Sequence, residues 1–119
     1  MKKILLVSRH APYGSSMAKD AIDVALAAAI YDQDISILFM DDGIFQLTKE
    51  QNASEISQKN INAMLSAFPL YGVEKLYFHL SSAIQRGIKI DELALDNITA
   101  LHDEEISTLL NSQDQVLSF

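Results

Sequence analysis

Short apolar runs alternate with amphipathic stretches along the whole chain. Each apolar run is bounded by turn-forming or charged residues, and such a run is typical of a strand that is buried on both faces. We expect strands at residues 3–8, 35–40, 75–79, 97–101 and 115–119.

Apolar residues at helical spacing predict helices between these strands. We expect helices over Met17–Tyr31, from about Ser54 to Phe68, from Ser81 or Ser82 to a stop at Gly87, and from Asp103 onward. Single helical turns are expected at 44–47 and within the loop at 88–96. Alternating strands and helices build a mainly parallel sheet with helices on both faces. The sequence therefore predicts one three-layer α/β/α domain over residues 1–119, with five strands in a flavodoxin-like arrangement.

The composition narrows the class of protein. A chain of 119 residues that is 49% hydrophobic suits one domain with one core. It has no cysteine, which excludes disulfides, thiolate metal sites and a cysteine nucleophile, and favours the cytosol. The apolar run at 4–7 is too short for a signal peptide, and no run approaches the length of a membrane span. We expect a cytoplasmic protein.

The formal net charge is −7, so the surface repels phosphate backbones. Direct binding of nucleic acid is therefore not expected.

Three loops should meet at the carboxyl edge of a parallel sheet, where such proteins bind ligands. They span residues 10–16, 41–43 and 79–82. The first loop lies at a helix start and could hold a phosphate, but it lacks GxGxxG and a Walker lysine. We favour a capped loop, with Ser15 or Ser16 as the cap and Tyr13 packing or meeting a partner.

The carboxyl-edge loops also carry candidate catalytic and metal-binding groups. Asp41 and Asp42 are adjacent on an extended chain and point to opposite sides, so a strand-ending turn is favoured over an acid–base pair. A nucleophilic role for Ser81 or Ser82 is not favoured, because neither serine lies in a G-x-S-x-G motif and helix capping explains a serine at this place. The histidines at 10, 79 and 102 lack the spacing of metal ligands. We expect no metal and no cofactor. His79 by itself is more often a structural residue than a catalyst.

Four stretches resemble the DsrE/DsrF-like family of sulfur-relay proteins, in order and over nearly the whole chain. They are KKILLVSRHAPYGSSMAKDAID, ISILFMDDGIFQL, YFHLSSAIQRGI and DQVLSF. The second is the most specific, because it is similar to a strand followed by D-G-V-F-Q-L. The resemblance implies the family's α/β fold. Within the family, the chain is most similar to the DsrF-type subunit.

The resemblance also suggests which position of the relatives His79 matches. In thiol-carrying relatives a cysteine stands eight residues before the glycine of an R-G pair, and that spacing from Gly87 leads back to His79. A relay sulfur is carried on a thiolate, which imidazole and thioether groups cannot replace. The chain is therefore expected to be a non-catalytic subunit.

The resemblance implies a set of partners. These are TusB-like and TusD-like chains in a heterohexamer of two heterotrimers, with TusA-like and TusE-like proteins reached through the complex. The pathway would lead to 2-thiouridine at the wobble position of tRNA. As interface residues we nominate apolar side chains in expected loops, namely Tyr13, Phe45, Leu47 and Tyr71.

Two other hypotheses remain open from the residues. The first is a stand-alone module that binds a small ligand or phosphate through the first loop. The second is an enzyme that uses His79 as an acid or base. Co-elution with the expected partners separates both from a subunit role.

Overall fold

A computed structural model describes residues 2–12, 15–48, 56–93, 95 and 97–119. The strands are β1 (Lys3–Ser8), β2 (Asp34–Phe39), β3 (Lys75–His79), β4 (Ile98–Leu101) and β5 (Gln115–Ser118). The α-helices are α1 (Met17–Ile30), α2 (Ile56–Ala67), α3 (Leu80–Gln85) and α4 (Asp103–Asn111). The 3-10 helices are η1 (Asp41–Leu47), η2 (Phe68–Tyr71) and η3 (Ile90–Glu92). Among the described segments, no helix is long and apolar enough to cross a bilayer.

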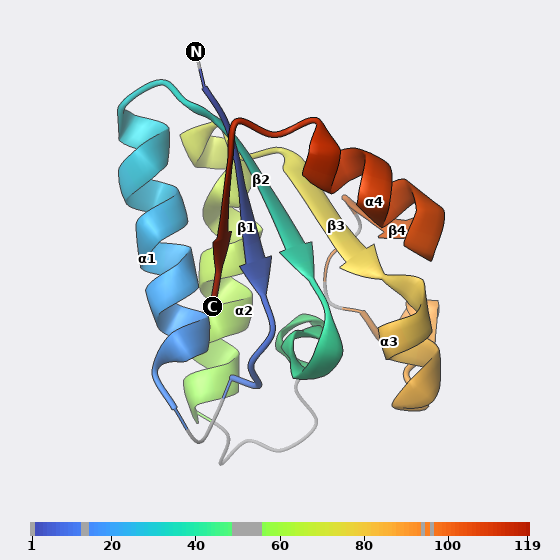
Figure 1. The fold of residues 1–119 in the computed structure, drawn as a ribbon. Helices are drawn as coiled ribbons and strands as arrows, with labels where there is room; N and C mark the ends of the chain where they lie inside the picture. The colour runs from blue at the N-terminus through green and yellow to red at the C-terminus, as the bar shows by residue number, and fades with distance from the viewer. Residues whose placement is uncertain (1, 13–14, 49–55, 94, 96) are drawn as a thin grey trace.

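The five strands form one sheet in the order β4-β3-β2-β1-β5, and every neighbouring pair is parallel. The chain leaves β1 toward β2 on one side and returns to its other side with β5. The order therefore reverses at β1, and the crevice beyond the carboxyl ends of β1 and β5 is where open α/β sheets bind ligands. The predicted three-layer α/β/α fold is confirmed, with an entirely parallel sheet (Figure 1).

The two faces of the sheet are covered unequally. The 14-residue α1 and the 12-residue α2 cover one face, where the larger core includes Leu6, Ile37 and Phe78. The other face carries the nine-residue α4 over a smaller core. That core consists of Leu5, Val7, Leu38, Leu101 and Ile106. An alternating pattern along β1 sends Leu5 and Val7 to one face and Leu6 to the other, as period-two side chains must.

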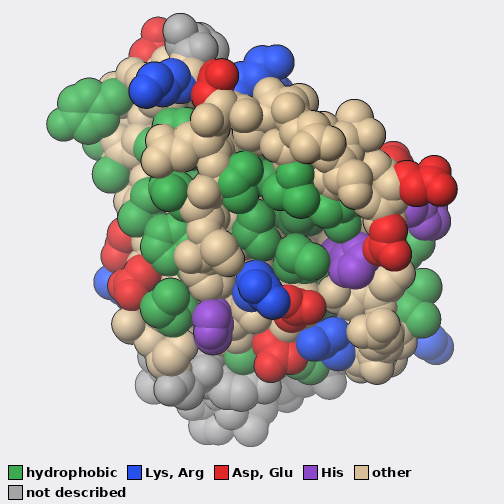
Figure 2. Space-filling view, viewed as in Figure 1, with side chains coloured by type: hydrophobic (Ala, Val, Ile, Leu, Met, Phe, Trp, Pro, Cys, Tyr) green, Lys and Arg blue, Asp and Glu red, His purple; other side chains and the backbone are tan. Residues whose placement is uncertain are grey.

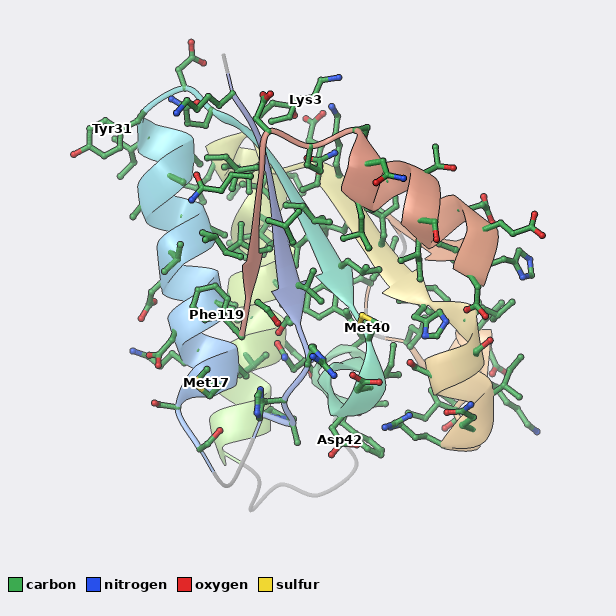
Figure 3. The ribbon with its side chains drawn as sticks, viewed as in Figure 1. Lys3, Met17, Tyr31, Met40, Asp42 and Phe119 are labelled. Carbon is green, nitrogen blue, oxygen red and sulfur yellow. The ribbon has the colours of Figure 1, made fainter. Side chains whose placement is uncertain are left out.

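The amino and carboxyl edges of the sheet carry different residues and loops. Lys3 and Tyr31 lie at the amino edge, whereas Met40, Asp42 and Phe119 lie toward the carboxyl edge, where the loops after β1, β2 and β3 gather (Figure 3). The carboxyl edge therefore carries the candidate site.

Most of the predicted elements are confirmed, and the differences are local. The helical turn expected at 44–47 is a longer 3-10 helix that begins at Asp41. Helix α3 begins at Leu80, with His79 as its N-cap, so the expected start at Ser81 or Ser82 is wrong. The start of α2 near Ser54 lies outside the described residues.

An ion pair fixes the amino ends of β2 and β3. The Lys75 ammonium donates to both carboxylate oxygens of Asp34, at 3.0 and 2.9 Å. This hydrogen bond raises the pKa of Lys75 above its ordinary value of 10.5. The side chain of Lys75 is 52% exposed, so solvent weakens the pair.

We expect Lys75→Met to lower the free energy of unfolding by less than about 1 kcal/mol. Because the pKa of Lys75 is higher in the folded chain than in the unfolded chain, its protonation stabilises the fold at pH values below the unfolded-state pKa. This stabilisation is lost as the pH rises through the folded-state pKa. The difference in unfolding free energy between Lys75→Met and wild type should thus be largest at pH values well below 10.5. It should disappear above the raised pKa of Lys75, as measured by denaturant unfolding. Lys19→Met, which removes a longer 3.5 Å pair with Asp23, is the control. A Lys75 effect that is independent of pH contradicts the assignment.

Candidate functional site

The segment η1 packs against the end of β1 more closely than any side chain would allow. A Cβ atom at Gly43 would stand 2.0 Å from the carbonyl oxygen of Ser8. The same oxygen accepts a hydrogen bond from the N–H of Met40 at 3.1 Å. Only glycine permits this approach, and it explains the glycine in the DDGIFQL stretch in physical terms.

Gln46 in the same segment holds the start of the first loop. Its side chain is buried, and its amide donates to Ser8 Oγ at 2.7 Å and to the carbonyl of His10 at 2.9 Å. Its Oε1 atom has no hydrogen-bond partner among the described residues. The glutamine therefore fixes the backbone after β1, a role that the sequence analysis did not assign to it.

Asp41 and Asp42 form ion pairs with different elements. Asp41 accepts a hydrogen bond from Arg9 at 2.8 Å, and Asp42 accepts one from Arg86 at 3.0 Å. Asp41 has a positive φ of 52°, as expected for a residue in a tight turn. The two carboxylates thus tie the loop after β2 to the end of β1 and to α3, in line with the predicted turn and not with a paired acid and base.

His79 is held through both ring nitrogens at the junction of β3 and α3. Its Nδ1 lies 2.7 Å from the Oγ of Ser82, and its Nε2 contacts the carboxylate of Asp103 at the start of α4. Ser82 Oγ also accepts the N–H of Asp41 at 2.9 Å. All groups are satisfied when the serine hydroxyl donates to Nδ1 and Nε2–H donates to Asp103. The imidazole therefore links the ends of three strands through fixed hydrogen bonds.

This network contains the residue types of a Ser-His-Asp triad, but it lacks an accessible nucleophile. Ser82 is 1% exposed, and its hydroxyl is engaged by both the backbone and the imidazole. The proposal that a serine caps α3 is also wrong, because the N-cap residue is His79 and no side chain makes the cap bond. Ser82 instead supports the histidine from within the helix.

The described part of the first loop offers little net positive charge to a phosphate. A hollow of about 510 Å³ next to it is lined by Arg9, His10, Arg86 and the two aspartates, among others. Both arginines are already paired with carboxylates, so they bring no net positive charge. At the start of α1, Ser15 Oγ accepts the N–H of Met17 at 3.4 Å, while Ser16 donates to Asp20.

The histidines show no sign of a metal site. Within the described ranges, no three His, Asp or Glu side chains converge in a way that could hold an ion. His10 offers its backbone carbonyl to Gln46, and His102 precedes α4, where its N–H donates to Glu105 at 2.9 Å.

The nominated interface residues lie in different environments. Tyr13 falls outside the described residues. Leu47 is fully buried in the larger core, so its nomination as a surface residue is wrong: the 3-10 helix η1 turns it inward beside Ile44. Phe45 is half-buried, and Tyr71 is 55% exposed at the end of η2. Of these, Tyr71 offers the largest exposed surface.

The fold and the site together define a class: a small three-layer α/β protein whose carboxyl edge holds a tethered histidine and no thiol. The sequence model of the DsrE/DsrF-like family matches residues 2–119, and the chain belongs to that family. It is also similar in structure to the YchN protein from E. coli, with a TM-score of 0.84, 26% identity and complete coverage of both chains.

Named relatives place the chain within the family more narrowly. It is 37% identical to a TusC homolog from Pseudomonas aeruginosa, over 98% of each chain. It is 35% identical to the intracellular sulfur oxidation protein DsrF from Allochromatium vinosum, over 100% of this chain and 97% of the relative. A TusC homolog from Vibrio parahaemolyticus is 34% identical over the full length of both chains. The chain is therefore TusC/DsrF-like.

Proposed function

We propose that this chain is a non-catalytic subunit of a cytoplasmic sulfur-relay complex. It assembles with TusB-like and TusD-like chains as a heterohexamer of two heterotrimers, and it reaches TusA-like and TusE-like proteins through that complex. The complex supports 2-thiolation of the wobble uridine in tRNA. Sulfur travels on the partner's cysteine, and this chain shapes the assembly around it.

The chemistry of position 79 carries this proposal. A travelling sulfur needs a thiolate that attacks a sulfur atom and then holds it as a persulfide. The chain has no cysteine, and the family resemblance implies that His79 stands where thiol-carrying relatives have the relay cysteine. Because both imidazole nitrogens are engaged by Ser82 and Asp103, the side chain is suited to holding the junction of α3 and α4 in place.

The names of the relatives agree with this role. The Allochromatium vinosum relative is described as an intracellular sulfur oxidation protein, and several full-length relatives are TusC proteins or TusC homologs. The stand-alone phosphate-binding alternative is less well supported, because Arg9 and Arg86 are neutralised by Asp41 and Asp42.

Assembly is the direct test of the proposal. The chain is mixed with purified TusB-like and TusD-like proteins of the same cells and passed through a sizing column. Elution of all three as one large species supports the subunit role. A chain that remains alone at every concentration contradicts it.

His79→Ala separates a structural histidine from a catalytic one. We expect tRNA 2-thiolation by the reconstituted system to stay close to wild type, because no sulfur passes through the imidazole. The free energy of unfolding should fall by about 1–3 kcal/mol, because buried Ser82 loses a hydrogen-bond partner. The control replaces the cysteine of the TusD-like partner with alanine, which should abolish thiolation. An equal loss in His79→Ala, with the complex still assembled, would overturn the non-catalytic assignment.

A further inference from the structure

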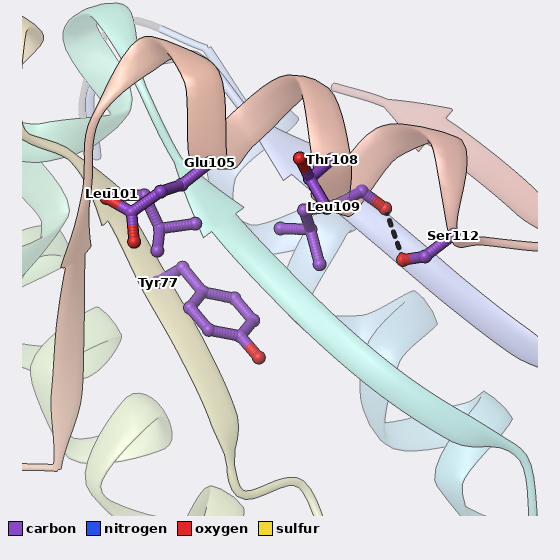
Figure 4. Close-up of a pocket in the computed structure, with 6 residues that line it drawn as sticks. All are labelled: Tyr77, Leu101, Glu105, Thr108, Leu109 and Ser112. Carbon is purple, nitrogen blue, oxygen red and sulfur yellow. Dashed lines mark hydrogen bonds between the residues drawn. The ribbon is translucent and has the colours of Figure 1, made fainter.

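An apolar groove and an acidic hollow lie next to each other along α4. The groove has a volume of about 370 Å³ and lies between α4 and the strands β3 and β4 (Figure 4). It is lined by Tyr77, Leu101, Glu105, Thr108, Leu109 and Ser112. The hollow, of about 590 Å³, is lined by Ser81, His102, Asp103, Glu104 and Glu105. Glu105 lines both, so the groove and the hollow adjoin at this residue and form what we name the α4 surface.

This surface lies on the less covered face of the sheet. Five strands about 4.8 Å apart make a face roughly 19 Å wide, whereas a helix is about 10 Å across. Helix α4 is the one α-helix of the described residues that packs on the smaller core. Parallel sheets are normally covered on both faces. Figure 2 shows apolar side chains in the middle of this face, with acidic and histidine side chains beside them at the start of α4.

The negative charges on the α4 surface determine which kind of partner group it can bind. The first turn of α4 carries Asp103, Glu104 and Glu105, and Asp103 is paired with His79. In the described part of the chain, neither of the two glutamates makes an ion pair with a basic side chain. Three carboxylates exceed the half positive charge of a helix N-terminus, so the hollow is negative overall. It therefore favours lysine or arginine and repels nucleic acid.

The same charges argue against a second copy of this chain as the occupant. The formal net charge is −7, so two copies repel each other before contact. A partner with a basic segment is instead attracted, and electrostatic attraction of this kind raises the rate of association. The neighbouring groove offers Tyr77 and Leu109 to an apolar or aromatic side chain, the residue type that anchors protein interfaces.

We propose that the α4 surface binds a basic segment of a partner protein. An apolar or aromatic residue of that segment enters the groove against Tyr77 and Leu109, and a lysine or arginine lies beside Glu104 and Glu105. Because Asp103 lines the hollow and also holds His79, the segment is brought next to the position of the relay cysteine in relatives. The assignment of the partner to a sulfur-relay assembly rests on the proposed function.

The absence of cysteine allows a direct test. Thr108→Cys places a single thiol in the groove, and Ile90→Cys places one on η3, at a residue that is 66% exposed. Each variant is labelled with a maleimide, alone and with purified TusB-like, TusD-like, TusA-like and TusE-like proteins added singly and together. We expect the labelling rate at position 108 to fall by about tenfold with the partner, and the rate at position 90 to stay unchanged.

A charge reversal tests the basic character of the partner. Glu104→Lys should weaken binding of the protecting protein by about tenfold at low salt, and the difference should shrink as salt screens the charges. Asp91→Lys makes the same change of charge on exposed η3 and should bind as wild type does. Glu105 is left intact because it caps α4.

The outcomes separate this inference from the proposed function. If wild type enters the complex but position 108 labels at the same rate with and without every partner, the inference fails and the subunit role stands. Protection of position 108 that grows with the concentration of this chain alone identifies a second copy and overturns the inference. If wild type binds none of the four proteins, both the inference and the proposed function fail.

Discussion

Gly43→Ala should lower the free energy of unfolding by about 3 kcal/mol or more, which makes it one of the two most damaging single changes expected in this chain. The added Cβ would meet the carbonyl oxygen of Ser8 at 2.0 Å. The neighbouring atoms, in the carbonyl of Ser8 and the Cα of Arg9, all belong to the backbone, so no side chain can move aside. A shift of η1 would also strain the bond from Met40 N–H to the same oxygen. Urea unfolding followed by circular dichroism measures the loss.

Gly72→Ala is the matched control for this prediction. An added Cβ at Gly72 meets nothing within 4 Å, but the residue has a φ of 82°. The expected cost is therefore only the left-handed backbone penalty of about 1–2 kcal/mol. A loss at Gly43 no larger than that at Gly72 would contradict the close approach to Ser8 as the main reason for glycine at this position.

Phe68→Ala should destabilise the chain by about 3–5 kcal/mol. Phe68 is fully buried in the larger core, at the turn that carries the chain from α2 into β3. Removing the ring deletes apolar contacts and leaves a cavity, because the surrounding strands and helices cannot collapse into the space. Thermal and denaturant unfolding should both report the change, with no change in the urea slope if the chain still unfolds in one step.

Tyr71→Ala, in the same 3-10 helix, is the control for Phe68. Its side chain is 55% exposed, so the free energy of unfolding should change by no more than about 0.5 kcal/mol. The same variant tests the nomination of Tyr71 as an interface residue. If it stays folded but co-elutes less with the TusB-like and TusD-like chains, its ring contacts a partner. A large loss of stability would show that the ring packs within this chain.

Periodicity predicted most of the fold. The apolar runs at β1 and β2 are continuous because both faces of a central parallel strand are buried, and this pattern depends on local sequence alone. Pro69 and Gly72 mark the end of α2 in the same local way, through backbone geometry. Elements whose formation depends on one stretch of chain could therefore be predicted from the sequence.

The errors occur where a side chain's environment depends on distant segments. Leu47 lies in the short helical turn expected after a strand and was nominated as exposed, yet the close approach of Gly43 to Ser8 draws η1 onto the core and buries it. Ser82 resembles a helix cap by position, but Asp41 and His79 engage its hydroxyl from two other parts of the chain. Neither arrangement has a signature within a short window of sequence.

The sequence by itself determined that this chain cannot carry sulfur as a cysteine persulfide, because a persulfide requires a thiol and the composition contains none. Through the family resemblance, it also predicted that position 79 matches the relay cysteine of thiol-carrying relatives. Only the tertiary structure decided what His79 does there, because its bond to Asp103 joins residues 24 apart. That contact exists because β3 and β4 pair in parallel register, with His79 opposite Leu101, which brings the start of α4 to the imidazole. The α4 surface arises from the same packing, since its residues come from strands and a helix that meet only in the folded chain.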